Sequence, residues 1–179
     1  AVGRQALTAN TTADDNVAVG DNALNLNTTG DGLTAIGTEA LLYNTTGANN
    51  TAVGRKALET NTTGTENVAV GAYAMDNSST SSYNTAVGYA ALTQMTTGNS
   101  NTALGHRAAD LSTTASNTVA VGTDALGALT TGNSNTAIGK DTLAQLTEVS
   151  EAVAVGFKAL AAMTGGTHNT AVGAYSGDA

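Results

Sequence analysis

A glycine returns every 17 residues along the whole chain, and no insertion or deletion interrupts the spacing. In all eleven copies the residue two places earlier is alanine, and the residue directly before the glycine is valine, isoleucine or leucine. A fixed period of about 20 residues is typical of solenoids, in which each repeat stacks on the next. We number the repeat from this glycine, which takes position 0. The glycines are Gly3, Gly20, Gly37, Gly54, Gly71, Gly88, Gly105, Gly122, Gly139, Gly156 and Gly173.

The five residues that end at the glycine, represented by Asn50, Thr51, Ala52, Val53 and Gly54, predict a short β-strand. Position −3 is β-branched in every complete copy, and small and bulky residues alternate, as they do in strands. We expect the bulky residues at −3 and −1 to point into the coil. Alanine at −2 and glycine at 0 would then face an opposing sheet or a neighbouring chain that approaches closely.

The remainder of the repeat predicts a second strand and two turns. Position +3 is alanine in nine copies and position +4 is leucine in eight, so we expect a short strand there. Thr-Thr-Gly occupies positions +8 to +10 in five copies, and these residue types favour turns. Position −4 is asparagine in seven of ten copies, among them Asn50, Asn67 and Asn84. We expect this asparagine column and the ladder of backbone hydrogen bonds to stiffen the stack.

These patterns predict an all-β fold, a β-solenoid with one 17-residue coil per repeat. Seventeen residues are too few for a strand, a helix and two turns, and no helical period is present. A disordered polar tract would not keep aliphatic residues in fixed columns. We expect a single domain over residues 1–179, with about ten and a half repeats, taken from a longer array.

Stacked coils place residues 17 apart side by side, which predicts where charges meet. All six basic residues lie at position +1 or +2, and acidic residues occupy the same corner of flanking coils. Exposed pairs of this kind contribute about 0.2–1 kcal/mol each and help to fix the register. The predicted partners are Arg4 with Asp21, Glu39 with Arg55 and Lys56, Arg107 with Asp124, and Asp141 with Lys158.

The motif Asn-Thr-Ala-Val-Gly at residues 50–54, 84–88 and 169–173 resembles the head repeats of trimeric autotransporter adhesins. Similar repeats occur in tail-fibre and surface-filament proteins of phages and bacteria. The resemblance implies a left-handed parallel β-roll, three copies of which pack into an obligate trimer that projects from a cell or virion. Adhesin repeats have about 14 residues, whereas these have 17.

Composition and residue spacing argue against catalysis. The chain has no cysteine, so thiol chemistry and cysteine metal sites are excluded, and its net charge of −8 disfavours nucleic acid. No apolar run approaches the roughly 20 residues that span a membrane. His106 and His168 are too far apart in the stack to share a metal. We therefore expect no enzyme, no cofactor and no metal site.

Two other polar patterns have simple interpretations. Asp14, Asp15, Asp31, Glu66 and Glu151 share the corner at +11 and +12, which either attracts cations or forms a solvated acidic edge. Asn-x-Thr/Ser sequences follow from the turn motif, so they are weak signals for glycosylation. They begin at Asn10, Asn27, Asn44, Asn49, Asn61 and Asn77.

Two columns are candidates for contact surfaces. The aromatic residues Tyr73, Tyr89, Phe157 and Tyr175 share the +1/+2 corner, where they could bind a sugar or partner, cover the corner, or pack against a neighbouring chain. Position +7 changes from asparagine in early coils to apolar residues in later ones. We expect another chain or segment to cover that edge at Leu129, Leu146 and Met163.

Together these features predict a structural fibre or adhesin segment that mediates attachment, outside the cell or on a virion. Its partners would be copies of itself, as a trimer or an end-to-end filament, and a host-surface protein or glycan. A phage tail-fibre shaft and a homopolymeric extracellular filament are alternatives. An ice-binding solenoid is a further one, motivated by the Thr-Thr column.

Overall fold

Ten short strands, one in each turn of the chain, form a single parallel sheet in the computed structural model, which describes residues 1–177. Residues 1–177 contain no helix. The strands are β1 (Val17–Val19), β2 (Thr34–Ile36), β3 (Thr51–Val53), β4 (Val68–Val70), β5 (Thr85–Val87), β6 (Thr102–Leu104), β7 (Val119–Val121), β8 (Thr136–Ile138), β9 (Val153–Val155) and β10 (Thr170–Val172).

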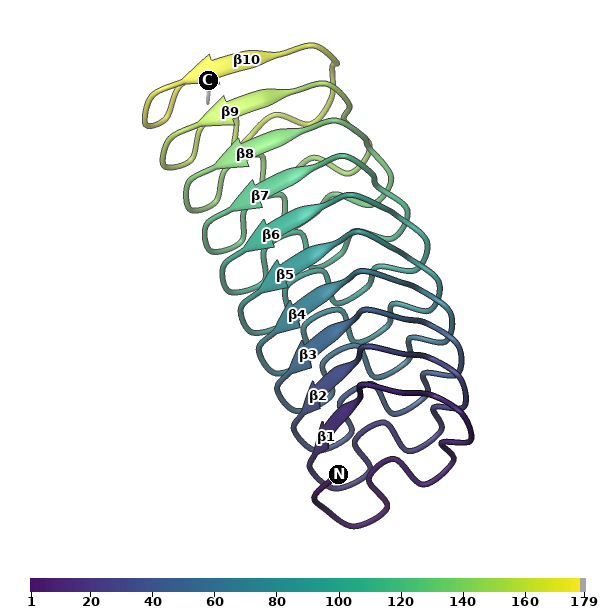
Figure 1. Cartoon of the computed structure of the whole chain (residues 1–179). Coiled ribbons are helices and arrows are strands. Elements are labelled where there is room, and N and C mark those ends of the chain that lie inside the picture. Colours follow the sequence, from purple (N-terminus) through teal and green to yellow (C-terminus); the bar gives the residue numbers. More distant parts are fainter. Residues whose placement is uncertain (178–179) are drawn as a thin grey trace.

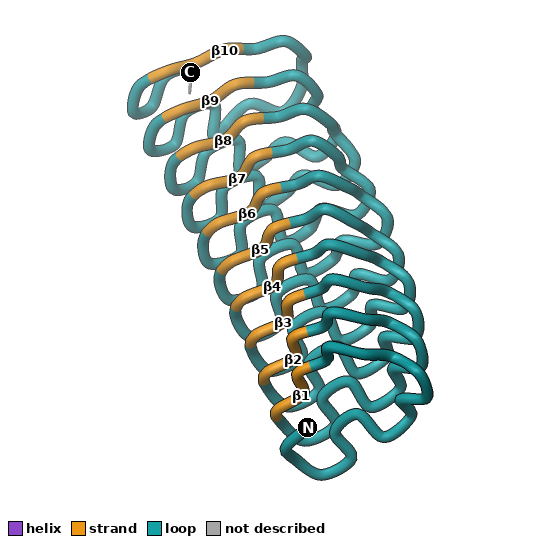
Figure 2. The backbone as a smooth tube through the Cα atoms, viewed as in Figure 1, coloured by secondary structure: helices purple, strands orange, loops and turns teal. Residues whose placement is uncertain are grey.

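Successive strands lie side by side in sequence order, each one coil above the last (Figure 1). The register joins equivalent residues, as in the pair Ala52 and Ala69, so each coil contains one 17-residue repeat. An isolated parallel bridge between Val2 and Val19 continues the sheet to the turn before β1. The strands line one side of the stack, and turns make up the remainder of each coil (Figure 2). The predicted parallel β-solenoid is confirmed.

Each strand has three residues rather than the predicted five, because the glycine at position 0 ends it. Gly54 has φ = 140°, a backbone conformation that L side chains rarely adopt. A Cβ atom on Gly54 would also lie 2.5 Å from the carbonyl oxygen of Gly71 in the next coil. The close approach that we expected at this position therefore comes from the equivalent glycine one turn away.

The predicted orientation of the strands is wrong. Ala52 at position −2 is fully buried, whereas Thr51 and Val53 on either side are partly exposed. The alanines of the other strands are buried in the same way. A coil of 17 residues is narrow, and the leucine of position +4, such as Leu58, already fills its centre. Only a small side chain fits on the opposite wall, so the bulky β-branched residues point outward.

The predicted second strand at +3 and +4 is also absent, and consecutive turns take its place. Positions +2 and +4 have positive φ, for example 59° at Lys56 and 51° at Leu58, which is incompatible with a regular strand. The backbone still pairs between coils, since the amide of Leu58 donates to the carbonyl of Ala74 at 3.0 Å.

Position +7 points into the coil, which overturns the expectation that another chain covers Leu129 and Leu146. Both side chains are buried within their own coils, and Met163 is half-buried against the same core. In early coils the same position carries asparagine. Asn44 donates its side-chain amide to Asn27 Oδ1 at 2.8 Å and to the Gly47 carbonyl at 2.9 Å. The drift along this column is therefore a change of core composition.

A second asparagine ladder runs along position −4, where the sequence has its asparagine column. Asn67 donates two hydrogen bonds to Asn50 Oδ1, one from its backbone amide at 2.9 Å and one from its side-chain amide at 3.1 Å. Asn84 donates to Asn67 Oδ1 in the same way, at 3.0 and 3.2 Å. Each side chain also bonds a carbonyl across its own coil, as Asn50 does with Gly64 at 2.7 Å. These bonds join the strand side of the coil to the turn side.

Candidate binding surfaces

The outward side chains of β1–β10, at positions −3 and −1, form a continuous stripe that we call the β face. Position −1 is always valine, isoleucine or leucine, and position −3 is valine or threonine. Val17 is 48% exposed, and the central residues Val87 and Leu104 are 38% and 37% exposed. None of the ten described strands carries a charged residue. At about 4.8 Å per strand, the β face is roughly 43 Å long.

The charge pairs predicted from the 17-residue spacing are present in three of four cases. Arg4 meets Asp21 at 2.8 Å, Lys56 meets Glu39 at 3.6 Å, and Arg107 meets Asp124 at 3.8 Å. The Arg4 guanidinium hydrogen-bonds Asp21 and lowers the pKa of that carboxyl. These pairs confirm that stacked corners place opposite charges together.

The fourth predicted pair, Asp141 with Lys158, is replaced by other contacts. Asp141 lies 3.6 Å from Lys140 in its own turn. The Lys158 ammonium lies 5.6 Å from the centre of the Phe157 ring. Arg55, which we expected to share Glu39 with Lys56, lies over the Tyr73 ring at 5.4 Å. Exposed aromatic rings thus compete with carboxylates for the cations of this corner.

The corner aromatics contact one another along the stack. Tyr89 lies between Tyr73, whose ring centre is 5.7 Å away in an edge contact, and His106, which stacks on it at 5.4 Å. Phe157 and Tyr175 form another edge contact at 5.3 Å. One face of Tyr89 is thereby covered by His106 of the next coil. The contacts favour the interpretation that these rings cover the corner, and a binding role stays a prediction.

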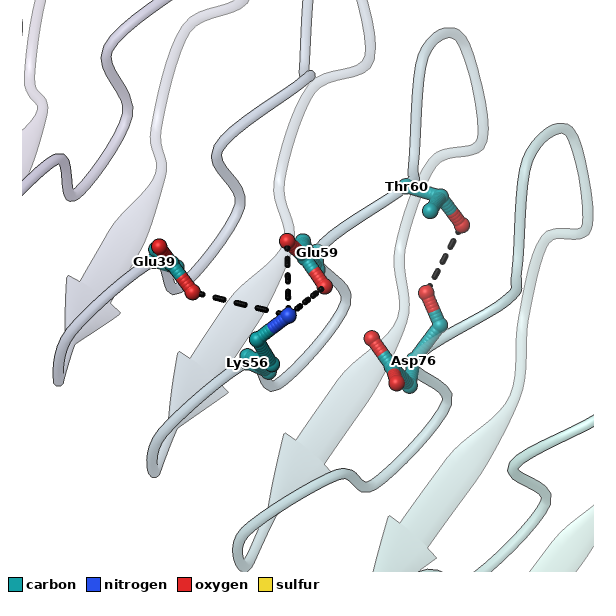
Figure 3. Close-up of polar contacts among 5 residues, drawn as sticks. All are labelled: Glu39, Lys56, Glu59, Thr60 and Asp76. Atoms are coloured by element: carbon teal, nitrogen blue, oxygen red, sulfur yellow. Dashed lines mark hydrogen bonds and ion pairs between the residues drawn. The ribbon is translucent and has the colours of Figure 1, made fainter.

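A group of charged residues on the turns after β2, β3 and β4 was not predicted from the sequence (Figure 3). Lys56 Nζ lies 3.1 Å from Glu59 Oε2 and bridges to Glu39. Glu59 and Asp76 occupy position +5 of adjacent coils. Burial of Asp76, together with the neighbouring Glu59 carboxylate, raises the pKa of Asp76 to about 6. Asp76 Oδ1 is buried without a hydrogen-bond partner. The 17-residue spacing of Glu59 and Asp76 was the available signal in the sequence.

The remaining polar candidates are at the surface. His106 and His168 are exposed on different coils, and His168 pairs with Glu151 in the coil below. Within residues 1–177, no group of three or more histidine, cysteine or acidic side chains could hold a metal ion. The acidic edge is solvent-exposed throughout, at Asp14, Asp15, Asp31, Glu66 and Glu151.

Burial separates the Asn-x-Thr/Ser sequences into two groups. Asn27, Asn44 and Asn61 are fully buried in the asparagine ladder of position +7, so their side chains are inaccessible in the folded chain. Asn49 and Asn77 are exposed, and Asn10 is half-buried. A modifying enzyme would therefore reach Asn49 and Asn77 on the folded chain.

A hollow of about 330 Å³ lies on the turns after β8 and β9. Alanines at positions +5 and +6 and charged residues at +2 surround it. The lining residues are Asp141, Ala144, Gln145, Lys158, Ala161 and Ala162. This site was not predicted from the sequence, because the repeat alone does not show that positions +5 and +6 point outward.

Comparison of the chain with profiles of known protein families, with curated proteins and with solved structures finds no match. No helix within residues 1–177 is long and apolar enough to cross a membrane. The features that bear on function are therefore the β face, the charged corner and the hollow.

Proposed function

We propose that this chain is a structural segment of a fibre, in which copies of the chain pack through their β faces into a stiff rod. The observation that carries the proposal is the uncharged β face, which runs along all ten strands and exposes valine, isoleucine and leucine. A continuous apolar stripe of this kind marks an interaction site more often than a free surface.

Copies of the same chain are the best partner for the β face. The chain carries a net charge of −8, so packing two copies elsewhere brings like charges together, whereas the β face has none. Because the stripe repeats every 17 residues, parallel copies align coil against coil along the whole rod. The resemblance to adhesin head repeats supports three copies and a left-handed roll. Closed rotational symmetry then buries every β face at the axis.

The role of such a rod is mechanical and multivalent. Inter-coil backbone bonds and the two asparagine ladders hold each coil to its neighbours, and the repeated outer surface multiplies weak contacts by avidity. We place the segment outside the cell, as part of an adhesin that attaches to host surfaces. A phage tail-fibre shaft and a homopolymeric filament use the same architecture and stay as alternatives.

The experiment is a mass measurement by light scattering, with circular dichroism on the same sample. We expect a β-rich particle with three times the 17.6 kDa mass of one chain. The double variant Val87→Glu/Leu104→Glu places charges in the middle of the β face and should yield monomers. The matched control Thr97→Glu/Thr114→Glu adds the same charges to exposed turns of the same coils and should keep the trimer. A wild-type chain that stays monomeric at high concentration contradicts the proposal.

An ice-binding solenoid is the second candidate, and the threonines that support it are different from those first considered. The Thr-Thr turn that first suggested it uses its first hydroxyl internally, since Thr45 Oγ1 donates to the Thr62 carbonyl at 3.0 Å. The outward threonines of the β face, such as Thr34 and Thr51, are half-buried and now provide the candidate array, which valines interrupt in β1, β4, β7 and β9. A monomer that depresses the freezing point below the melting point would support this function. Absence of that gap removes it.

A further inference from the structure

The hollow after β8 and β9 lies where other coils contain an internal ion pair. In the turn after β3, Lys56 at position +2 meets Glu59 at position +5, with 3.1 Å between Nζ and Oε2. In the turn after β6, Arg107 at +2 meets Asp110 at +5, with 2.8 Å between Nε and Oδ2. The solenoid thus repeatedly places a carboxylate beside a basic residue at this corner.

The turn after β9 has the basic residue without that carboxylate. Lys158 occupies position +2, but Ala161 occupies position +5 and cannot supply an acceptor oxygen. The preceding coil contributes Ala144 at the same position. Because both side chains are methyl groups, the space that a glutamate or aspartate fills in the other turns remains open as the hollow of about 330 Å³.

We propose that the hollow binds a carboxylate-bearing sugar residue, with the ligand's carboxylate on the Lys158 ammonium. The volume lies within the range of roughly 300–1,000 Å³ that is common for small-molecule sites. The methyl groups of Ala144, Ala161 and Ala162 offer an apolar floor for the C–H face of a sugar ring. The Asp141 carboxylate accepts hydrogen bonds from hydroxyl groups, and the Gln145 amide both donates and accepts them.

The local charge favours an anionic ligand in spite of the acidic chain. Lys158 lines the hollow, and Lys140 lies 3.6 Å from Asp141, so two cations accompany one anion here. A simple apolar ligand would make no use of the Lys158 ammonium, whereas the carboxylate of an acidic sugar pairs with it. The inference deepens the proposed function, since it gives an attachment fibre a glycan ligand, and it rests on that function for its biological role only.

The test is a titration followed by NMR of isotope-labelled alanine methyl groups. Glucuronic acid and N-acetylneuraminic acid are the probes, and glucose is the uncharged comparison. We expect saturable shifts at Ala144, Ala161 and Ala162, with dissociation constants of about 1–10 mM for at least one acid and at least about fivefold weaker binding of glucose. Equal binding of glucose, or shifts centred elsewhere, overturns the assignment.

Two variants and a control sharpen the result. Ala161→Glu rebuilds the ion pair that Lys56 makes with Glu59 and should weaken binding at least about tenfold, and Lys158→Gln should do the same. Thr131→Glu adds the same charge at an exposed turn outside the lining of the hollow and should bind as the wild type does. Unchanged binding by Ala161→Glu contradicts the proposal. The titration is valid at any oligomeric mass, so its failure leaves the fibre proposal untouched.

Discussion

At the scale of the residue, three positions in every repeat, besides the glycine at position 0, hold the backbone at positive φ. They are +2, +4 and +12, with φ between 50° and 63° at the non-glycine residues that occupy them. Each such residue costs about 1–2 kcal/mol of backbone strain. The compensation is an inter-coil hydrogen bond. The amide of Lys56 at +2 donates to Thr38 in the previous coil at 2.9 Å, whereas that of Leu58 at +4 donates to Ala74 in the next coil.

Replacing the glycine at position 0 should be far more harmful than replacing a free glycine. Gly54→Ala combines a φ of 140° with a Cβ atom 2.5 Å from the Gly71 carbonyl oxygen. We expect a loss of about 2–4 kcal/mol of unfolding free energy. Gly165→Ala is the matched control, because no atom lies within 4 Å of the added Cβ. Denaturant unfolding measures both. Equal effects of the two substitutions would show that the contact between the added Cβ and the Gly71 carbonyl does not destabilise the fold.

Asp76 should make the chain more stable in mild acid. Burial and the adjacent Glu59 raise its pKa to about 6, above the usual 3.8 of an aspartate. The folded state therefore keeps a proton that the unfolded state releases, so the unfolding free energy falls as pH rises between these two values. After discounting for solvent screening of a half-exposed group, we expect about 1 kcal/mol more stability at pH 4.5 than at pH 7.

The variant Asp76→Asn isolates this contribution, because it cannot ionise and keeps the shape of the side chain. Its unfolding free energy should change less between pH 4.5 and 7 than that of the wild type. The difference should appear as greater stability of the variant at pH 7. A wild-type curve that rises over this range, with the same slope in the variant, would contradict the assignment.

At the scale of the element, the asparagine ladder of position +7 should tolerate no change of hydrogen-bonding character. Asn44→Asp keeps the shape of the side chain but replaces its NH₂ group by an oxygen. That oxygen would face Asn27 Oδ1 and the Gly47 carbonyl, to which the NH₂ group donates in the wild type. A buried charge without a partner costs about 3–5 kcal/mol. Asn49→Asp, the same change at an exposed position, should cost little. Thermal melts at pH 7 compare the two, and lowering the pH should partly restore Asn44→Asp.

The sequence predicted the coil and its register but not which way the strand faces. A period of 17 with alternating residues gives the stacking of Ala52 on Ala69, because a one-residue slip would break every column. Alternation alone does not say which face is inside. The face that points inward depends on how much space the coil encloses, and Leu58 fills that space from the opposite side. The enclosed space is set only when the whole turn has closed, so it cannot be read from the strand sequence.

The turn conformation had a signal in the sequence that went unused. Threonine and valine are frequent in this chain, yet no β-branched residue occurs at +2, +4 or +12. β-Branched side chains are strongly disfavoured at positive φ, so their absence marks these positions as turns. The hollow was less accessible to sequence reasoning. It needs both the outward direction of position +5 and the absence of bulk at Ala144 and Ala161.

At the scale of the whole molecule, stability should depend on whole coils and not on particular residues. Each coil contacts only its two neighbours in the sheet, so the fold behaves as a one-dimensional stack. Deleting residues 89–105 removes one complete repeat and joins Gly88 to His106, which leaves every column in register. The shortened chain should fold, with the same circular dichroism per residue and only a modest decrease in melting temperature.

Deleting residues 89–96 is the contrasting change, since it removes fewer residues but shifts every later column. At the junction Gly105 would then stack on Thr80 instead of Gly88, so the glycine column would break between the coils on either side. We expect this chain to lose cooperative unfolding, although it is longer than the first variant. If both deletions melt alike, the 17-residue coil is not the unit that carries stability, and the stacking argument for a rigid fibre fails with it.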